Sequence, residues 1–195
     1  MANVNTPKGF VPLNNGKCRT TLYKCNTADN IFIGDPVVLT NDGNITVQSD
    51  TAGSVYMVGV VLGFVDSNRA GFGSAMEKYP YYKQLTENVF AIVCDDPNQL
   101  YLVQEHTPLT GGVTLRLTNV GNSIMHCYKQ TSGSTITGIS GAELVSDTTA
   151  VLAASGLFRI VDILDAVDNT TGNWAKWIVK PNRIQNVPSA VGQIV

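Results

Sequence analysis

The chain has 195 residues, of which 44% are hydrophobic and only 14% are charged, and its formal net charge is −2. This length suits one domain or two small β-subdomains that share a core. Typical domains are roughly 25% charged, so we expect other subunits to cover part of this surface. No cluster of lysine and arginine occurs, so the electrostatic pattern of a nucleic-acid-binding protein is missing.

The sequence shows no membrane segment and no secretory signal. Its longest apolar run, residues 55–65, is far shorter than the roughly 20 residues that span a bilayer, and we predict one or two buried strands there. The opening MANVNTPKGF lacks the basic and apolar regions of a signal peptide, so we expect a soluble protein made in a reducing compartment. The four cysteines, Cys18, Cys25, Cys94 and Cys127, form no C-x-x-C pair and are expected to be free, mostly buried thiols.

Residues 1–30 are polar and show few periodic apolar positions. Two prolines flank residues 9–11 and favour an extended backbone over a helix. An extended chain rises at most about 3.3–3.6 Å per residue, so about fifteen residues span on the order of 50 Å. We therefore predict an extended N-terminal arm, with Phe10 and Val11 in an apolar pocket of a partner or of the same oligomer. Deleting residues 2–12 is expected to leave the rest of the chain folded.

From residue 31 onward, short apolar runs alternate with turn residues. Strands are predicted within residues 31–39, 45–48, 55–65, 88–94, 99–105, 112–118, 157–164 and 173–180. Asn-Asp-Gly at 41–43 is a strong hairpin signal. In the last segment Ala175, Trp177 and Val179 alternate with polar neighbours, which is typical of a half-buried strand. The one candidate helix lies at 147–157.

Short strands separated by regular turn signals favour an all-β sandwich or barrel. We predict a compact, barrel-like or sandwich body over residues 31–185, preceded by the arm over 1–30 and followed by a C-terminal tail over 186–195.

Asp95 and Asp96 are the most suggestive chemical pair, because adjacent carboxylates beside Cys94 suit a metal or acid–base site. Pro97 restricts the backbone, however, and Asp and Asn favour turn positions. Apolar runs flank the stretch on both sides, so we interpret Asp-Asp-Pro-Asn as a turn between two strands. Replacing both aspartates by asparagine is expected to leave metal content and assembly unchanged.

No other motif indicates an enzyme, a metal site or a cofactor site. The two histidines, His106 and His126, are interpreted as surface or core residues, and neither G-x-S-x-G nor a P-loop occurs. Tyr79, Tyr81 and Tyr82 form an aromatic cluster that suits stacking on single-stranded nucleic acid or sugars. Tyrosine is also enriched at protein–protein interfaces, and without a basic groove we favour that interpretation.

Six segments follow one another in an order that resembles a known family. They are ANVNTPKGFVPL, FIGDPVVL, VGVVLGF, CDDPNQLYLVQ, TGISGAEL and RIVDILDAVDNTTGNWAKWIVKPNRIQ. Together they resemble the capsid decoration (cement) proteins of tailed bacteriophages. The resemblance implies a non-enzymatic virion protein, made in the host cytoplasm, that binds the major capsid protein on the capsid exterior and bridges its subunits.

A homotrimer is expected, because closed cyclic symmetry is the norm for such assemblies. No cofactor, nucleic acid or membrane is expected as a partner. The alternative is a tail-associated receptor- or glycan-binding module, in which the cluster Tyr79, Tyr81 and Tyr82 forms the binding face.

Overall fold

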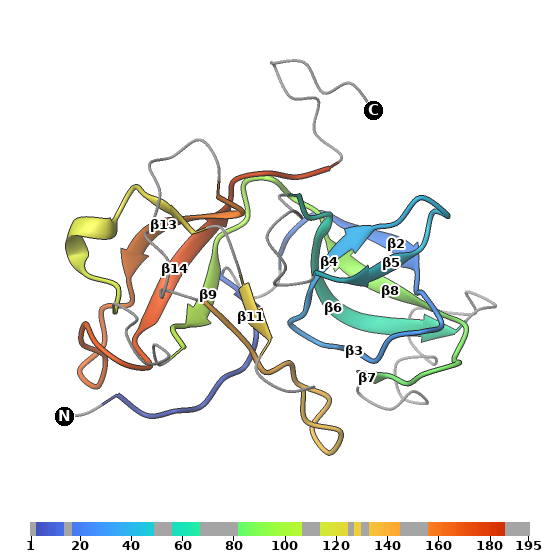
Figure 1. Cartoon of the computed structure of the whole chain (residues 1–195), viewed down its shortest axis with the longest axis horizontal. Helices are drawn as coiled ribbons and strands as arrows, with labels where there is room; N and C mark the ends of the chain where they lie inside the picture. The colour runs from blue at the N-terminus through green and yellow to red at the C-terminus, as the bar shows by residue number, and fades with distance from the viewer. Residues whose placement is uncertain are drawn as a thin grey trace.

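The computed structural model describes residues 3–13, 17–48, 56–66, 82–106, 114–124, 127–129, 133–144 and 156–185. Within these residues every regular element except one short 3-10 helix is a β-strand, which confirms the predicted all-β class. Two five-stranded antiparallel sheets lie side by side in Figure 1, and two small two-stranded sheets accompany them. The candidate helix at 147–157 and the tail at 186–195 lie outside the described residues, apart from residues 156 and 157.

The first sheet has the order β1-β9-β14-β13-β10. Its strands are β1 (Val11–Pro12), β9 (Tyr101–Gln104), β14 (Lys176–Pro181), β13 (Phe158–Ile163) and β10 (Ser123–Ile124). Ala175, Trp177 and Val179 are fully buried, while Lys176 and Lys180 on the opposite face are half-buried. The predicted alternation of this segment is confirmed.

The second sheet has the order β2-β8-β6-β4-β5. Its strands are β2 (Thr20–Lys24), β8 (Val89–Cys94), β6 (Gly59–Asp66), β4 (Pro36–Leu39) and β5 (Ile45–Val47). The 41–43 hairpin joins β4 to β5, with Leu39 opposite Ile45, as predicted. A parallel bridge between Cys25 and Ile45 brings the two outer strands together at one end, so this sheet curls toward a barrel.

The small sheets pair β3 (Ile31–Phe32) with β7 (Tyr82–Lys83) and β11 (Cys127–Lys129) with β12 (Ala142–Leu144). The strand predicted over 112–118 is wrong in its described part, where η1 (Leu117–Asn119) forms instead. The Asn119 side chain accepts a hydrogen bond from the Arg116 amide at 2.8 Å, and the Asn119 amide donates to the Arg116 carbonyl. These local bonds close a turn, and Leu117 is left 58% exposed.

The N-terminal segment is extended, but the predicted boundary at residue 30 is wrong. Residues 3–10 form no strand and run along the first sheet (Figure 1). The arm then enters the body, because β1 pairs with β9 and β2 pairs with β8 over five residue pairs. The pairing satisfies backbone groups that a free arm would leave to water.

Most buried apolar side chains of the described residues fall into two clusters, one for each large sheet. The first includes Tyr101, Phe158 and Trp177, and the second fills the curled sheet. Val60 and Cys94 belong to strands of the second sheet but pack in the first cluster. The two cores therefore meet where β6 and β8 approach β9.

Candidate functional site

The stretch Asp95 to Asn98 connects the two sheets. β8 ends in the second sheet and β9 begins in the first, so the strands on either side of this turn are not paired with each other. The Asn98 amide donates to Asp96 Oδ1 at 2.9 Å, and the Gln99 amide donates to the Asp96 carbonyl at 3.2 Å. The predicted turn is confirmed. That it connects two different sheets was not predicted from the sequence.

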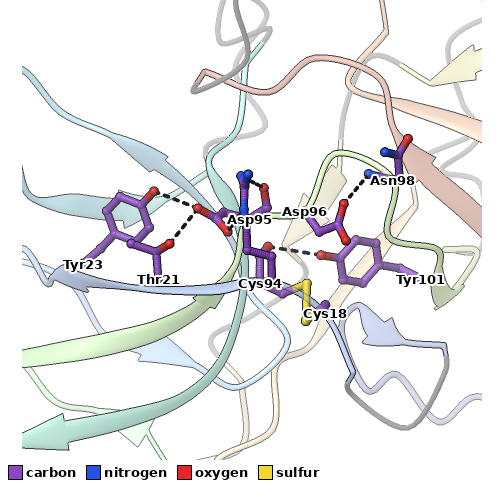
Figure 2. Close-up of polar contacts among 9 residues, drawn as sticks. Cys18, Thr21, Tyr23, Cys94, Asp95, Asp96, Asn98 and Tyr101 are labelled. Atoms are coloured by element: carbon purple, nitrogen blue, oxygen red, sulfur yellow. Dashed lines mark hydrogen bonds and ion pairs between the residues drawn. A yellow bond between two sulfur atoms is a disulfide. The ribbon is translucent and has the colours of Figure 1, made fainter.

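Asp95 faces away from that turn, toward β2 (Figure 2). Its carboxylate is buried and accepts hydrogen bonds from Arg19 Nε at 2.9 Å, Thr21 Oγ1 at 2.9 Å and the Tyr23 hydroxyl at 3.3 Å. The hydrogen bond and the negative charge of Asp95 raise the pKa of Arg19 above its ordinary value. The two adjacent carboxylates therefore bind different parts of the molecule and do not converge on a common ligand.

The described residues contain no group of three or more histidine, cysteine, aspartate or glutamate side chains arranged to hold a metal ion.

The cysteines correct one expectation. Cys18 and Cys94 form a disulfide across 76 residues of sequence, with their Cα atoms 5.9 Å apart, so these two are not free thiols (Figure 2). The pairing follows from the β2–β8 register, which sets Thr20 opposite Cys94 and brings Cys18 to the end of β8. Cys25 is a free buried thiol, as predicted, and burial raises its pKa to about 12.

Phe10 lies in the core of its own chain and is not exposed for a partner. It is 1% exposed and stacks on Phe158 with ring centroids 4.4 Å apart, while Tyr101 meets it edge-on at 6.4 Å. Its prediction as a partner anchor is therefore wrong, because the β1–β9 pairing carries it into the first cluster. Val11 points outward, is 39% exposed and lines a pocket of about 130 Å³ on this sheet.

Of the predicted tyrosine cluster, Tyr79 and Tyr81 lie outside the described residues. Tyr82 is half-buried and stacks on Phe32, with ring centroids 4.8 Å apart and an angle of 12° between the rings. One face of Tyr82 is thus occupied within its own chain. The neighbouring Lys83 is buried, and its Nζ donates to the Asp29 carbonyl.

A buried polar network beside the first sheet was missed by sequence reasoning. Gln104 Nε2 donates to Glu143 Oε1 at 2.6 Å, and His106 Nδ1 lies 2.8 Å from Glu143 Oε2. Glu105 accepts hydrogen bonds from the Trp177 indole at 2.9 Å and from a backbone amide. Burial hides these carboxylates from any large substrate, so the network serves to join β9, β12 and β14.

The sequence did contain one signal for this network. Tyr101, Val103 and Glu105 share the same side of a strand with period two, so Glu105 had to point inward with its apolar neighbours. Glu143 offered no comparable pattern, because Gln104 and His106, to which it bonds, are more than 30 residues away in the sequence.

Among the described residues, the two most exposed apolar side chains lie on loops. Ile136 is 87% exposed at the tip of the loop 134–138, and Val167 is 92% exposed on the β13–β14 loop. The Gly138 amide donates to the Ser134 carbonyl at 2.7 Å and closes the first of these loops. Its base is fixed by Ser140, whose hydroxyl donates to buried Asp35 at 2.5 Å. The side chain of Ile136 is therefore exposed on a loop that its own hydrogen bonds hold in place.

No family model matches this sequence, and no curated protein or solved structure is significantly similar to it. No helix in the described part of the chain is long and apolar enough to cross a membrane.

Proposed function

We propose that this chain is a non-enzymatic structural protein of a tailed-bacteriophage virion that decorates the outer capsid surface. It stabilises the capsid by bridging neighbouring subunits of the major capsid protein. The proposal rests on the ordered resemblance of six sequence segments to capsid decoration proteins. Two of these segments lie on main strands of the fold. FIGDPVVL runs from the last residue of β3 through β4, and RIVDILDAVDNTTGNWAKWIVKPNRIQ covers the β13–β14 hairpin except for the first residue of β13.

One observation of the fold supports this function most directly. Ile136 is an exposed apolar side chain on the loop 134–138, and that loop is closed by its own hydrogen bonds and anchored through Ser140 to Asp35. A contact that is ordered before binding loses less conformational entropy when it forms. Several such contacts acting together hold a protein on a repetitive surface even when each is weak.

A tail-associated receptor- or glycan-binding module is the alternative. It would use the faces of Tyr79, Tyr81 and Tyr82 for stacking. Tyr82 already stacks on Phe32 in its own chain, which reduces the ring surface open to a ligand. We therefore favour the capsid assignment.

Electron microscopy of virions from the phage that encodes this chain tests the assignment. The expected result is additional density on the outer capsid surface that fits the two-sheet fold and disappears from particles lacking the protein. Density confined to the tail would reject the capsid assignment. Replacing Ile136 by Asp should lower the occupancy of that density, while the control Thr135→Asp on the same loop should lower it less.

A further inference from the structure

Two cations face each other at one end of the β13–β14 hairpin. Arg159 is directly opposite Lys180 in the antiparallel register, so both side chains project from the same face. Like charges in directly opposite positions destabilise a sheet. Within the described residues neither cation forms an ion pair with a carboxylate, and Lys180 Nζ donates only to Asn98 Oδ1 at 2.8 Å. A bound anion would therefore relieve the repulsion between these two positive charges.

Both cations line one surface pocket of about 310 Å³. Its other walls are partly apolar, from Pro97, Pro181 and Ile184, and partly amide-bearing. A carboxylate next to a small apolar side chain matches both features, because the cations attract the charge and the proline rings cover the apolar group.

At the opposite end of the same hairpin, the β13–β14 loop carries carboxylates next to a small apolar side chain. Asp165 and Asp168 are exposed on the β13–β14 loop, and between them Val167 is 92% exposed. None of these carboxylates forms an ion pair with another described residue. The loop is therefore an acidic tip with one apolar side chain.

This acidic tip is held in place by its own base. Asn169 Nδ2 donates to the carbonyls of Leu164 at 2.8 Å and Lys176 at 3.0 Å, and its Oδ1 accepts from the Lys176 amide at 2.8 Å. These bonds tie the loop to both strands that it connects. The tip is ordered before any contact forms, which lowers the entropy lost on docking.

We propose that the acidic tip of one copy, residues 165–168, docks into the Arg159–Lys180 pocket of a second copy of this chain. The tip cannot reach its own pocket, because strands of six residues at about 3.3 Å per residue separate the two ends by roughly 20 Å. Figure 1 shows the loop at the outer end of the hairpin, away from the connection between the sheets. A contact between two different surfaces repeats head to tail and closes into a ring when the rotation permits. The inference deepens the proposed function by supplying the contact within the trimer.

Charge reversal followed by charge exchange tests this contact on the purified full chain. One variant carries Arg159→Glu with Lys180→Glu, a second carries Asp165→Lys with Asp168→Lys, and a third combines all four substitutions. Analytical ultracentrifugation measures the self-association constant of each. We expect either reversal to weaken association by about tenfold or more, and the combined variant to recover most of the loss.

Reversal of the exposed cations Lys17 and Lys24 to Glu is the matched control and should leave association unchanged. Urea unfolding checks that each variant folds. If the Arg159→Glu, Lys180→Glu variant does not fold, the variant with Arg159→Gln and Lys180→Gln replaces it, because it removes both positive charges without adding negative ones. A wild type that stays monomeric at its highest soluble concentration overturns the inference. The inference is also overturned if the combined variant associates no more strongly than either single reversal.

The measurement uses no capsids, so its failure is distinguishable from a failure of the proposed function. A chain that associates through this contact but is absent from capsids would refute only the capsid assignment.

Discussion

Asp95 and Asp96 differ in environment although they are adjacent in the chain. Asp95 follows the last residue of β8, and its buried side chain binds three donors on or beside β2. Asp96 is partly exposed and accepts a hydrogen bond within its own turn. The two carboxylates therefore make separate contacts, Asp95 with β2 and its approach and Asp96 within the turn.

Replacing Asp95 by Asn should lower the free energy of unfolding by roughly 1–3 kcal/mol, because a buried carboxylate loses charge-assisted hydrogen bonds from Thr21 and Tyr23. The ion pair with Arg19 contributes little to the free energy of unfolding, since the Arg19 side chain is 56% exposed. Asp96→Asn should cost about 1 kcal/mol or less, because an amide oxygen can still accept from Asn98. Urea unfolding measures both, and metal content should not change. Equal costs, or a lost metal, would contradict the assignment.

Cys25 should make the protein less stable in alkali. Burial raises the pKa of its thiol from 9.0 to about 12 in the folded chain. Between these values the unfolded chain releases the proton while the folded chain keeps it, so stability falls as the pH rises above about 9. Cys25→Ala removes this dependence.

Urea unfolding of both proteins at about pH 8 and about pH 10 gives the measurement. The stability advantage of the wild type over Cys25→Ala should shrink by roughly 1 kcal/mol across this interval. A constant difference would show that the thiol titrates alike in both states.

Among the elements, β6 and β8 are held together by a close backbone approach. A Cβ atom on Gly59 would lie 2.1 Å from the Cys94 carbonyl oxygen and 2.7 Å from the Val93 side chain. Gly59 and Gly63 have the spacing of a membrane helix motif, but in this fold they lie on a strand. Glycine is therefore required at position 59, because any side chain would clash with the backbone of the neighbouring strand β8.

Gly59→Ala should therefore cost more than about 3 kcal/mol or prevent folding, since the obstructing atom belongs to the backbone. Gly43 is the matched control. Its φ of +79° strains any other residue, but nothing lies within 4 Å of its Cβ position. Gly43→Ala should cost only about 1–2 kcal/mol. Urea unfolding compares the two variants, and similar values would refute the close-packing argument.

For the molecule as a whole, the N-terminal segment is part of the fold. Asn3 bonds to Thr170 and Asn173, and Thr6 bonds to Gln104, so the segment is fastened to the first sheet before Phe10 enters the core. The expectation that residues 2–12 can be deleted without loss of folding is replaced by its opposite.

Phe10→Ala should lower the free energy of unfolding by about 3–5 kcal/mol, because it leaves a cavity beside Phe158 and Tyr101. Val11→Ala is the neighbouring control and should cost less than about 1 kcal/mol, since Val11 is 39% exposed. Deletion of residues 2–12 should destabilise the fold at least as much as Phe10→Ala. Thermal unfolding followed by circular dichroism measures all three, and a stable truncated protein would restore the arm hypothesis.

The sequence by itself determined the all-β class, the hairpin at 41–43, the turn at 95–98 and the inward face of β14. These features depend on period-two patterns and turn chemistry, which act over a few adjacent residues. Where local bonds competed, as at Asn119, the pattern predicted a strand wrongly.

Only the tertiary structure decided which strands share a sheet, that Cys18 meets Cys94, that Phe10 lies in its own core and that Arg159 faces Lys180. Each of these depends on which strands pair and in which register they pair. A register is set by the packing of whole sheets, and a shift of one residue would turn every side chain to the other face. The register therefore cannot be predicted from a short stretch of sequence.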